Sequence, residues 1–332
     1  MQPHYIASTK LAFFFLAAVF AMQVYQAAEE PIRGGEAYIY DRFVRPTTRQ
    51  ILAQELLNRD VLSSLLEKRS VGLFHVSPFS VRLPSLLFGL LYLRSLWQLA
   101  RLLLGGGRGF LVATVAAGVI PLEWDCFSRA NGVGGALALM LCAVWLVIQY
   151  LTCNQNVNPI KLNLSGACLG LSVAMRLDFV LPAAALGLVW LVIFARRKQW
   201  AVWTDRILVP AVVSALVILA VPLSHAHAVE EEFQELTAGQ AAHLQAALAA
   251  LQAAAGSDRI RIGAPTTEPI VNFYRAQHRV ITWDRATRDL SAGPVDYYLL
   301  PASAAEPVAR RHLIVLYRDA DFLVARRSAA SM

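Results

Sequence analysis

The side chains that could do chemistry in this chain are a few carboxylates and arginines near the ends of long apolar runs. Glu36 and Asp41 follow the first run, Arg82 precedes the second, and Asp125 and Arg129 lie in the polar stretch before the fourth. Carboxylates accept protons, and guanidinium groups bind carboxylate or phosphate oxygens. Each group also has a simpler interpretation: Glu36 as a solvated loop charge, Arg82 as an interfacial anchor, and Asp125 with Arg129 as an i,i+4 ion pair.

Other polar residues give weaker signals. Arg176 and Asp178 interrupt an apolar run, which favours a function, although pairing at a tight turn is the simpler interpretation. His225 and His227 have no third ligand to suggest a metal site. The four cysteines lie in or beside apolar runs and are interpreted as small buried hydrophobes. No CxxC, HExxH, GxGxxG or P-loop pattern occurs, so a soluble nucleotide or zinc enzyme has no support.

Composition indicates whether these residues belong to a soluble protein or to a membrane protein. The 332 residues are 57% hydrophobic and only 16% charged, whereas soluble domains average roughly 25% charged residues. The net charge of +7 could suit nucleic acid. Many of the basic residues flank apolar runs, however, where they suit anionic lipid headgroups. The sequence therefore predicts a multi-pass membrane protein that does not bind nucleic acid.

Seven apolar runs could cross a bilayer, which requires about 20 residues for a helix. The first is favoured as an uncleaved anchor, because it stays apolar beyond a passable cleavage site. The fifth and sixth are short and are separated by the Arg176/Asp178 turn. The predicted spans are 11–28, 83–104, 110–122, 134–151, 164–175, 179–195 and 207–223.

The basic cluster Arg196, Arg197 and Lys198 decides the predicted orientation. Cytoplasmic loops carry an excess of lysine and arginine. Seven spans with the N-terminus inside then place residues 224–332 outside the cytoplasm. The arginine-rich loop 29–82 would also lie outside, which a long loop tolerates.

Two parts of the chain lie between or beyond the spans. Within the long first outer loop, residues 47–66 have apolar side chains with charged ones between them, which predicts one or two amphipathic helices at the interface or packed on the bundle. Residues 224–332 predict a small α/β domain with helices at 230–255 and 266–276. Its strands are predicted at 259–263, 280–283, 297–300, 313–317 and 322–325, the last two joined as a hairpin. The predicted domains are thus 1–223 and 224–332.

Four stretches follow one another in a familiar order: GGEAY at 34–38, SPFSVRLPS at 77–85, EWDCFSRANGV at 123–133 and EPIVNFYR at 268–275. Together they resemble the bacterial GT-C membrane glycosyltransferases, the group related to protein O-mannosyltransferases and the lipid A aminoarabinose transferase. The second stretch is the most specific. The resemblance implies a mainly α protein of GT-C type in the cytoplasmic membrane, with about seven transmembrane helices here. A small α/β domain would follow them outside the cytoplasm.

The resemblance also implies an inverting reaction in which a sugar passes from a polyprenyl-phosphate donor to a glycan, lipid or protein acceptor on the outer face. A carboxylate would act as general base, and arginines would stabilise the departing phosphate. Glu36 is then base or metal contact, and Asp125 is a second acidic contact. Arg82 and Arg129 would hold the phosphate. The supporting residues are Asp41, Tyr38, Arg176 and Asp178. Metal dependence stays open.

Three departures from the family pattern bear on activity. Gly35 stands where the family usually has aspartate, and Asn131 and Val133 stand where it tends to have arginine and tyrosine. These departures favour an alternative, a non-catalytic GT-C-like partner or lipid-binding subunit. A small transporter is the less favoured third hypothesis, since the spans hold few charges and the halves do not repeat.

Overall fold

The computed structural model describes residues 3–45, 61–105, 107–118, 126–152, 160–219, 238–290, 295–304 and 313–327. Asp125, His225, His227 and Cys153 lie outside these ranges. The chain forms two compact units, each described by itself. One unit comprises Met1–Glu29, Thr47–Leu73 and Phe79–Val229, and the other comprises Glu30–Pro46, Phe74–Pro78 and Glu230–Met332. Part of the first loop therefore folds with the C-terminal residues.

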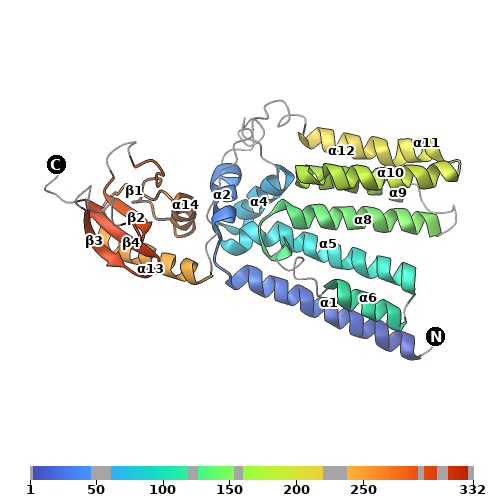
Figure 1. The fold of residues 1–332 in the computed structure, drawn as a ribbon, viewed down its shortest axis with the longest axis horizontal. Coiled ribbons are helices and arrows are strands. Elements are labelled where there is room, and N and C mark those ends of the chain that lie inside the picture. Colours follow the sequence, from blue (N-terminus) through green and yellow to red (C-terminus); the bar gives the residue numbers. More distant parts are fainter. Residues whose placement is uncertain are drawn as a thin grey trace. The chain divides into compact units, whose positions relative to one another are not determined.

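The first unit is helical, and Figure 1 shows its long helices running roughly parallel. A helix occurs at each of the seven predicted runs. Among the described residues, four are long and apolar enough to cross a membrane: Ser8–Glu29, Pro78–Leu104, Gly132–Thr152 and Leu177–Arg196. The predicted count of seven spans is not confirmed. The helices are α1 (Pro3–Glu29), α4 (Val61–Phe74), α5 (Pro78–Leu104), α6 (Arg108–Gly118), α8 (Gly132–Thr152), α9 (Ile160–Met175), η2 (Leu177–Phe179), α10 (Val180–Arg196), α11 (Trp200–Trp203), η3 (Thr204–Leu208) and α12 (Val209–Leu219).

Glycines allow α9 to pack closely on the segment η3–α12. A Cβ at Gly166 would stand 2.3 Å from the Ile207 carbonyl oxygen, and one at Gly170 would stand 2.0 Å from that of Ala211. The spacing is the small-xxx-small pattern that brings membrane helices together. The Ser214 hydroxyl adds a hydrogen bond to the Ala167 carbonyl at 3.2 Å.

Helix α4 packs on the apolar helices of the first unit, one of the two arrangements expected for the amphipathic part of the first loop. Leu62 and Leu66 lie against the main apolar cluster. Ser63, Ser64 and Glu67 are buried as well, so the inner face of α4 is mixed rather than purely apolar. The rest of the predicted amphipathic stretch lies outside the described residues.

The second unit combines a sheet of strand order β1-β2-β4-β3 with helices. Strand β1 (Ile262–Gly263) pairs parallel to β2 (Tyr297–Pro301), and β4 (Phe322–Arg327) pairs antiparallel to both β2 and β3 (Leu313–Arg318). Helix α13 (Ala238–Ala255) packs against β3 and β4. The other helical elements are α2 (Gly34–Ile39), the π-helical turn η1 (Tyr40–Val44) and α14 (Glu268–Gln277). The small C-terminal sheet is thereby confirmed.

Two of the predicted strands differ in detail. Residues 280–283 form no strand: only an isolated bridge joins Trp283 to Ile260, after a turn in which Arg279 has a φ of 51°. The strand predicted at 259–263 shortens to the two residues of β1. The terminal hairpin is confirmed, and its turn is closed by the Asp319 carboxylate, which accepts the Asp321 and Phe322 amides at 2.9 and 2.7 Å.

Candidate functional site

Glu36 stands at the third position of α2, where it closes the helix N-terminus. The preceding Arg33 has extended backbone angles, and its N–H donates to the Glu36 Oε2 at 3.0 Å. An acid in the first turn also suits the positive end of the helix dipole. The residue is only 5% exposed. Glu36 is therefore a buried carboxylate held by the backbone, rather than the solvated loop charge of the simpler interpretation.

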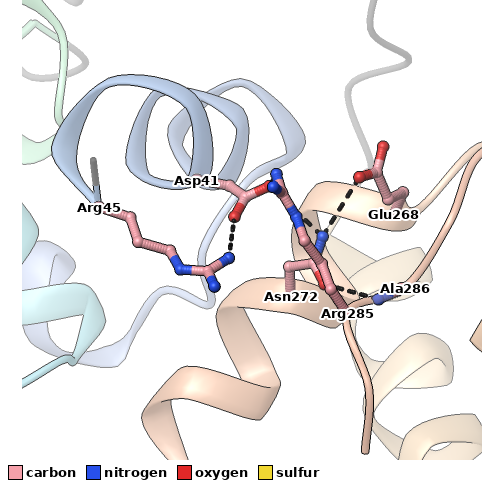
Figure 2. A network of polar contacts seen from close by, with 6 residues as sticks. All are labelled: Asp41, Arg45, Glu268, Asn272, Arg285 and Ala286. Atoms are coloured by element: carbon pink, nitrogen blue, oxygen red, sulfur yellow. Dashed lines mark hydrogen bonds and ion pairs between the residues drawn. The ribbon is translucent and has the colours of Figure 1, made fainter. Parts of the chain in front are cut away.

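Asp41 lies one turn further along, in η1, at the centre of a polar network (Figure 2). Its side chain is 6% exposed and receives guanidinium groups from Arg285, at 2.5 Å, and from Arg45, at 3.1 Å. The Asn272 amide donates to the same carboxylate at 3.3 Å. Both arginines are about half exposed. A buried charge is tolerated when it is paired and hydrogen-bonded in this way.

Asn272 links this carboxylate to the first turn of α14. Its Nδ2 donates both to Asp41 and to the Glu268 Oε1 at 3.3 Å, while its Oδ1 accepts the Ala286 amide at 2.9 Å (Figure 2). Burial raises the pKa of Glu268, and the negative charge of Asp41 raises it further, against the lowering effect of nearby arginines. Two carboxylates thus share one amide.

Aromatic rings complete the attachment of α2–η1 to α14. The Tyr40 ring meets Phe273 edge-on with centroids 5.1 Å apart, and burial raises the pKa of the Tyr40 phenol. Tyr38 instead meets Phe43 edge-on at 5.9 Å within its own segment. The carboxylate-bearing helix is consequently fixed to α14 by apolar and polar contacts together.

Arg82, the predicted phosphate partner, lies in α5 of the first unit with no solvent exposure. Its Nη1 donates to the Ala27 carbonyl at 3.2 Å. The final turn of α1 carries partial negative charge, which a guanidinium group stabilises. Because Arg82 is fully buried within the unit, its side chain does not extend outward as an interfacial anchor would. Glu36 and Arg82 belong to different units, and their roles as base and phosphate partner of one reaction stay a prediction.

The third motif is described only from Cys126 onward, so Asp125 lies outside the described residues. Arg129 is half-buried in the turn before α8. Asn131, one of the departures from the family pattern, accepts the Gly134 amide with its side-chain oxygen at 3.5 Å, a long contact at the usual place of an N-cap. A Cβ at Gly134 would stand 2.4 Å from the Cys126 carbonyl oxygen. This stretch thus serves the start of α8.

Arg176 and Asp178 contact each other, as the tight-turn interpretation predicted. The Arg176 Nε stands 2.9 Å from the Asp178 Oδ2, and the two side chains are 29% and 50% exposed. The pair flanks Leu177 at the turn between α9 and α10.

Several candidate residues escaped the sequence analysis. Glu67 in α4 is 1% exposed, and its carboxylate accepts the Ser63 hydroxyl at 2.8 Å. The i,i+4 spacing of a serine and an acid was its only local signal. Asn272 and Arg285 contact Asp41 from more than 220 residues away, and no local spacing predicts these contacts. Glu268 and Asn272 lie in the fourth motif stretch, 268–275, which gave them no individual role. No group of three or more histidines, cysteines and acids suited to a metal occurs among the described residues.

Comparison with known proteins bears on the membrane part. Residues 62–225, just under half of the chain, match the family model of the dolichyl-phosphate-mannose-protein mannosyltransferases. No curated protein and no solved structure gives a significant match. Together with the apolar helices, the match supports a membrane protein whose helical part is similar to that glycosyltransferase family.

Proposed function

We propose that this chain is a membrane glycosyltransferase that moves a sugar from a polyprenyl-phosphate donor to an acceptor on the outer face of the cytoplasmic membrane. The observation that carries the proposal is the match over residues 62–225 to a family whose sugar donor is named as a lipid-phosphate-linked mannose. The motif resemblance at 34–38 and 268–275 lies outside that match and adds independent support.

Glu36 is the proposed general base. It is a buried carboxylate, and a carboxylate is a group that can accept the proton of an acceptor hydroxyl. Its backbone contact with Arg33 holds the side chain in one orientation, as a base needs for reach to the acceptor hydroxyl. Asp125 is proposed as a second acidic contact.

Arg82 and Arg129 are the proposed partners of the donor phosphate. The guanidinium group has a rigid donor geometry that suits phosphate oxygens. Arg82 would also have a structural role, because its buried hydrogen bond to the Ala27 carbonyl joins the start of α5 to the end of α1.

The alternative is a non-catalytic relative that binds lipid or a partner enzyme. The observation in its favour is that the acids nearest to the first motif serve structural contacts: Glu36 caps α2, and Asp41 binds two arginines and an amide. Gly35, moreover, supplies no carboxylate at the position where the family has aspartate.

A transfer assay with the purified full chain and labelled polyprenyl-phosphate sugars separates these two functions. Glu36→Gln keeps an oxygen that can accept the Arg33 amide but no longer accepts a proton, and we expect its rate to fall about 10²- to 10⁴-fold. Glu30→Gln is the matched control, since Glu30 is more exposed and pairs with the Arg33 side chain. Absence of transfer by the unaltered chain would favour the non-catalytic relative.

A further inference from the structure

A pocket of about 360 Å³ lies within the second unit, between α13, α14 and two short segments of the first outer loop. Its floor is apolar and includes Leu244, Leu248 and Phe273, all at most 1% exposed. Its polar groups include the amides of Gln245 and Gln277. A concave apolar site with a few polar groups is the usual form of a small-molecule site.

The residue types that line this pocket distinguish it from a site for the anionic polyprenyl-phosphate donor. The described residues that line it include no arginine, lysine, aspartate or glutamate. A polyprenyl-phosphate donor carries an anionic phosphate, which proteins bind with guanidinium, ammonium or clustered N–H groups. Burial raises the pKa of the Tyr274 phenol, so this lining group is neutral at physiological pH. The ligand is therefore expected to be uncharged.

The residues that line the pocket include two aromatic side chains, Tyr274 and His278, and two glutamines. The rings of Tyr274 and His278 stand 4.2 Å apart and are tilted by 38°, and Tyr274 also stacks with the buried Trp283 at 6.0 Å. Each glutamine side chain offers a donor and an acceptor side by side. Neutral saccharides match both features, because their C–H faces pack on aromatic rings and their neighbouring hydroxyls pair with an amide.

The pocket is also connected to the segment that bears the proposed base. Ile32 lines it and lies four residues before Glu36. Phe273 lines it as well, and its ring meets Tyr40 of η1 edge-on. A ligand held here therefore contacts α14 and the residues just before α2, and α14 in turn packs on the segment that carries Glu36 and Asp41.

We propose that this pocket binds a neutral saccharide and serves as an acceptor subsite; the acceptor role, though not the binding itself, rests on the proposed function. The direct test is saturation-transfer NMR on the full chain in phosphatidylcholine nanodiscs. Glycosidic detergents must be avoided, since their sugar headgroups would compete. The probes are glucose, galactose, N-acetylglucosamine and lactose, with glucuronate as the charged counterpart. We expect signals from at least one neutral sugar and weaker signals from glucuronate.

Variants on α13 and α14 make the test specific. Tyr274→Ala should raise the dissociation constant of the sugar about 3- to 10-fold, the contribution of one aromatic contact. Tyr274→Phe should bind the sugar as the unaltered chain does, because the ring remains. Gln277→Ala should weaken binding without touching the ring stack. Gln240→Ala is the matched control, since Gln240 lies on α13 but does not line this pocket.

The result that would overturn the proposal is no saturation transfer from any neutral sugar, or transfer that is equal in Tyr274→Ala, Gln277→Ala and the unaltered chain. Displacement of the sugars by a serine/threonine peptide or by a fatty acid, at lower concentration than the sugars themselves, would also overturn it in favour of that occupant. Retention of a labelled polyprenyl-phosphate sugar is measured separately on the same nanodiscs. If the unaltered chain does not retain the donor, the proposed function is contradicted. If it retains the donor but binds no neutral sugar, only the assignment of this pocket is contradicted.

Discussion

Replacement of Asp41 should loosen the attachment of α2–η1 to α14. The carboxylate is 6% exposed, whereas the two arginines that it pairs with are 44% and 48% exposed. Solvent screening therefore limits each ion pair to about 0–1 kcal/mol. The Asn272 amide is buried, and removing its acceptor costs about 1–3 kcal/mol. Together, Asp41→Ala should destabilise this attachment by about 2 kcal/mol, or roughly 30-fold in the opening equilibrium.

Hydrogen–deuterium exchange of the full chain in nanodiscs measures this opening directly, because local exchange follows the local free energy. Peptides covering residues 34–44 should exchange about 30-fold faster in Asp41→Ala. Asp41→Asn should give a smaller change, since its oxygen still accepts the Asn272 amide while the ion pairs are lost.

The matched control is Asp284→Ala. Asp284 also pairs with two arginines, Arg259 at 2.8 Å and Arg261 at 3.6 Å, but its side chain is more exposed. It should leave the exchange of residues 34–44 unchanged. The reasoning would be refuted if Asp41→Ala exchanged like the unaltered chain, or if Asp284→Ala had an equal effect on the same peptides.

Three further predictions test other parts of the chain. Gly170→Ala forces a Cβ against the Ala211 carbonyl and should cost about 1–3 kcal/mol of stability, whereas Gly187→Ala, with nothing within 4 Å, should not; thermal unfolding in detergent compares them, and equal melting temperatures would contradict the α9–α12 packing. The folded-state pKa of Glu268 is raised above its ordinary 4.5, so the folded chain binds this proton more tightly, and stability should fall as pH rises through the raised pKa. Glu268→Gln should flatten that decline in melting temperature, and an unchanged pH profile would remove this residue as its cause. A reporter fused after Met332 should be active outside the cytoplasm; cytoplasmic activity would reverse the predicted orientation.

Apolar runs located the membrane helices well, because burying a continuous stretch in lipid leaves the backbone few other structures. The same runs did not establish how many of them cross a bilayer. Helix α9 has only 16 residues, and its packing depends on Gly166 and Gly170. That spacing was legible in the sequence as a small-xxx-small pattern, but its partner helix was not.

Strands β2, β3 and β4 were predicted from short apolar runs, and the turn between β3 and β4 also identified their pairing. A similar run misled at residues 280–283, where Trp283 is buried without a strand. The site residues show the same limit. Glu36 and Asp41 were found from their place in the chain. The contacts of Asn272 and Arg285 with Asp41 were not predicted, although Asn272 lies in the quoted stretch 268–275, because a contact across more than 220 residues has no local periodicity.

Variants of Glu36 can separate a catalytic role from a structural one, whereas variants of Asp41 cannot. No neutral residue can replace Asp41 without loss of its ion pairs, so reduced activity in an Asp41 variant would report a displaced helix as readily as a lost acid. Glutamine at position 36 can still accept the Arg33 amide, as it does in capping boxes generally. A rate loss in Glu36→Gln with unchanged exchange of residues 34–44 therefore identifies proton acceptance as the lost property. If Glu36→Gln keeps full activity, the base lies on another element, and Asp125 and the buried Glu67 are the acids to replace next.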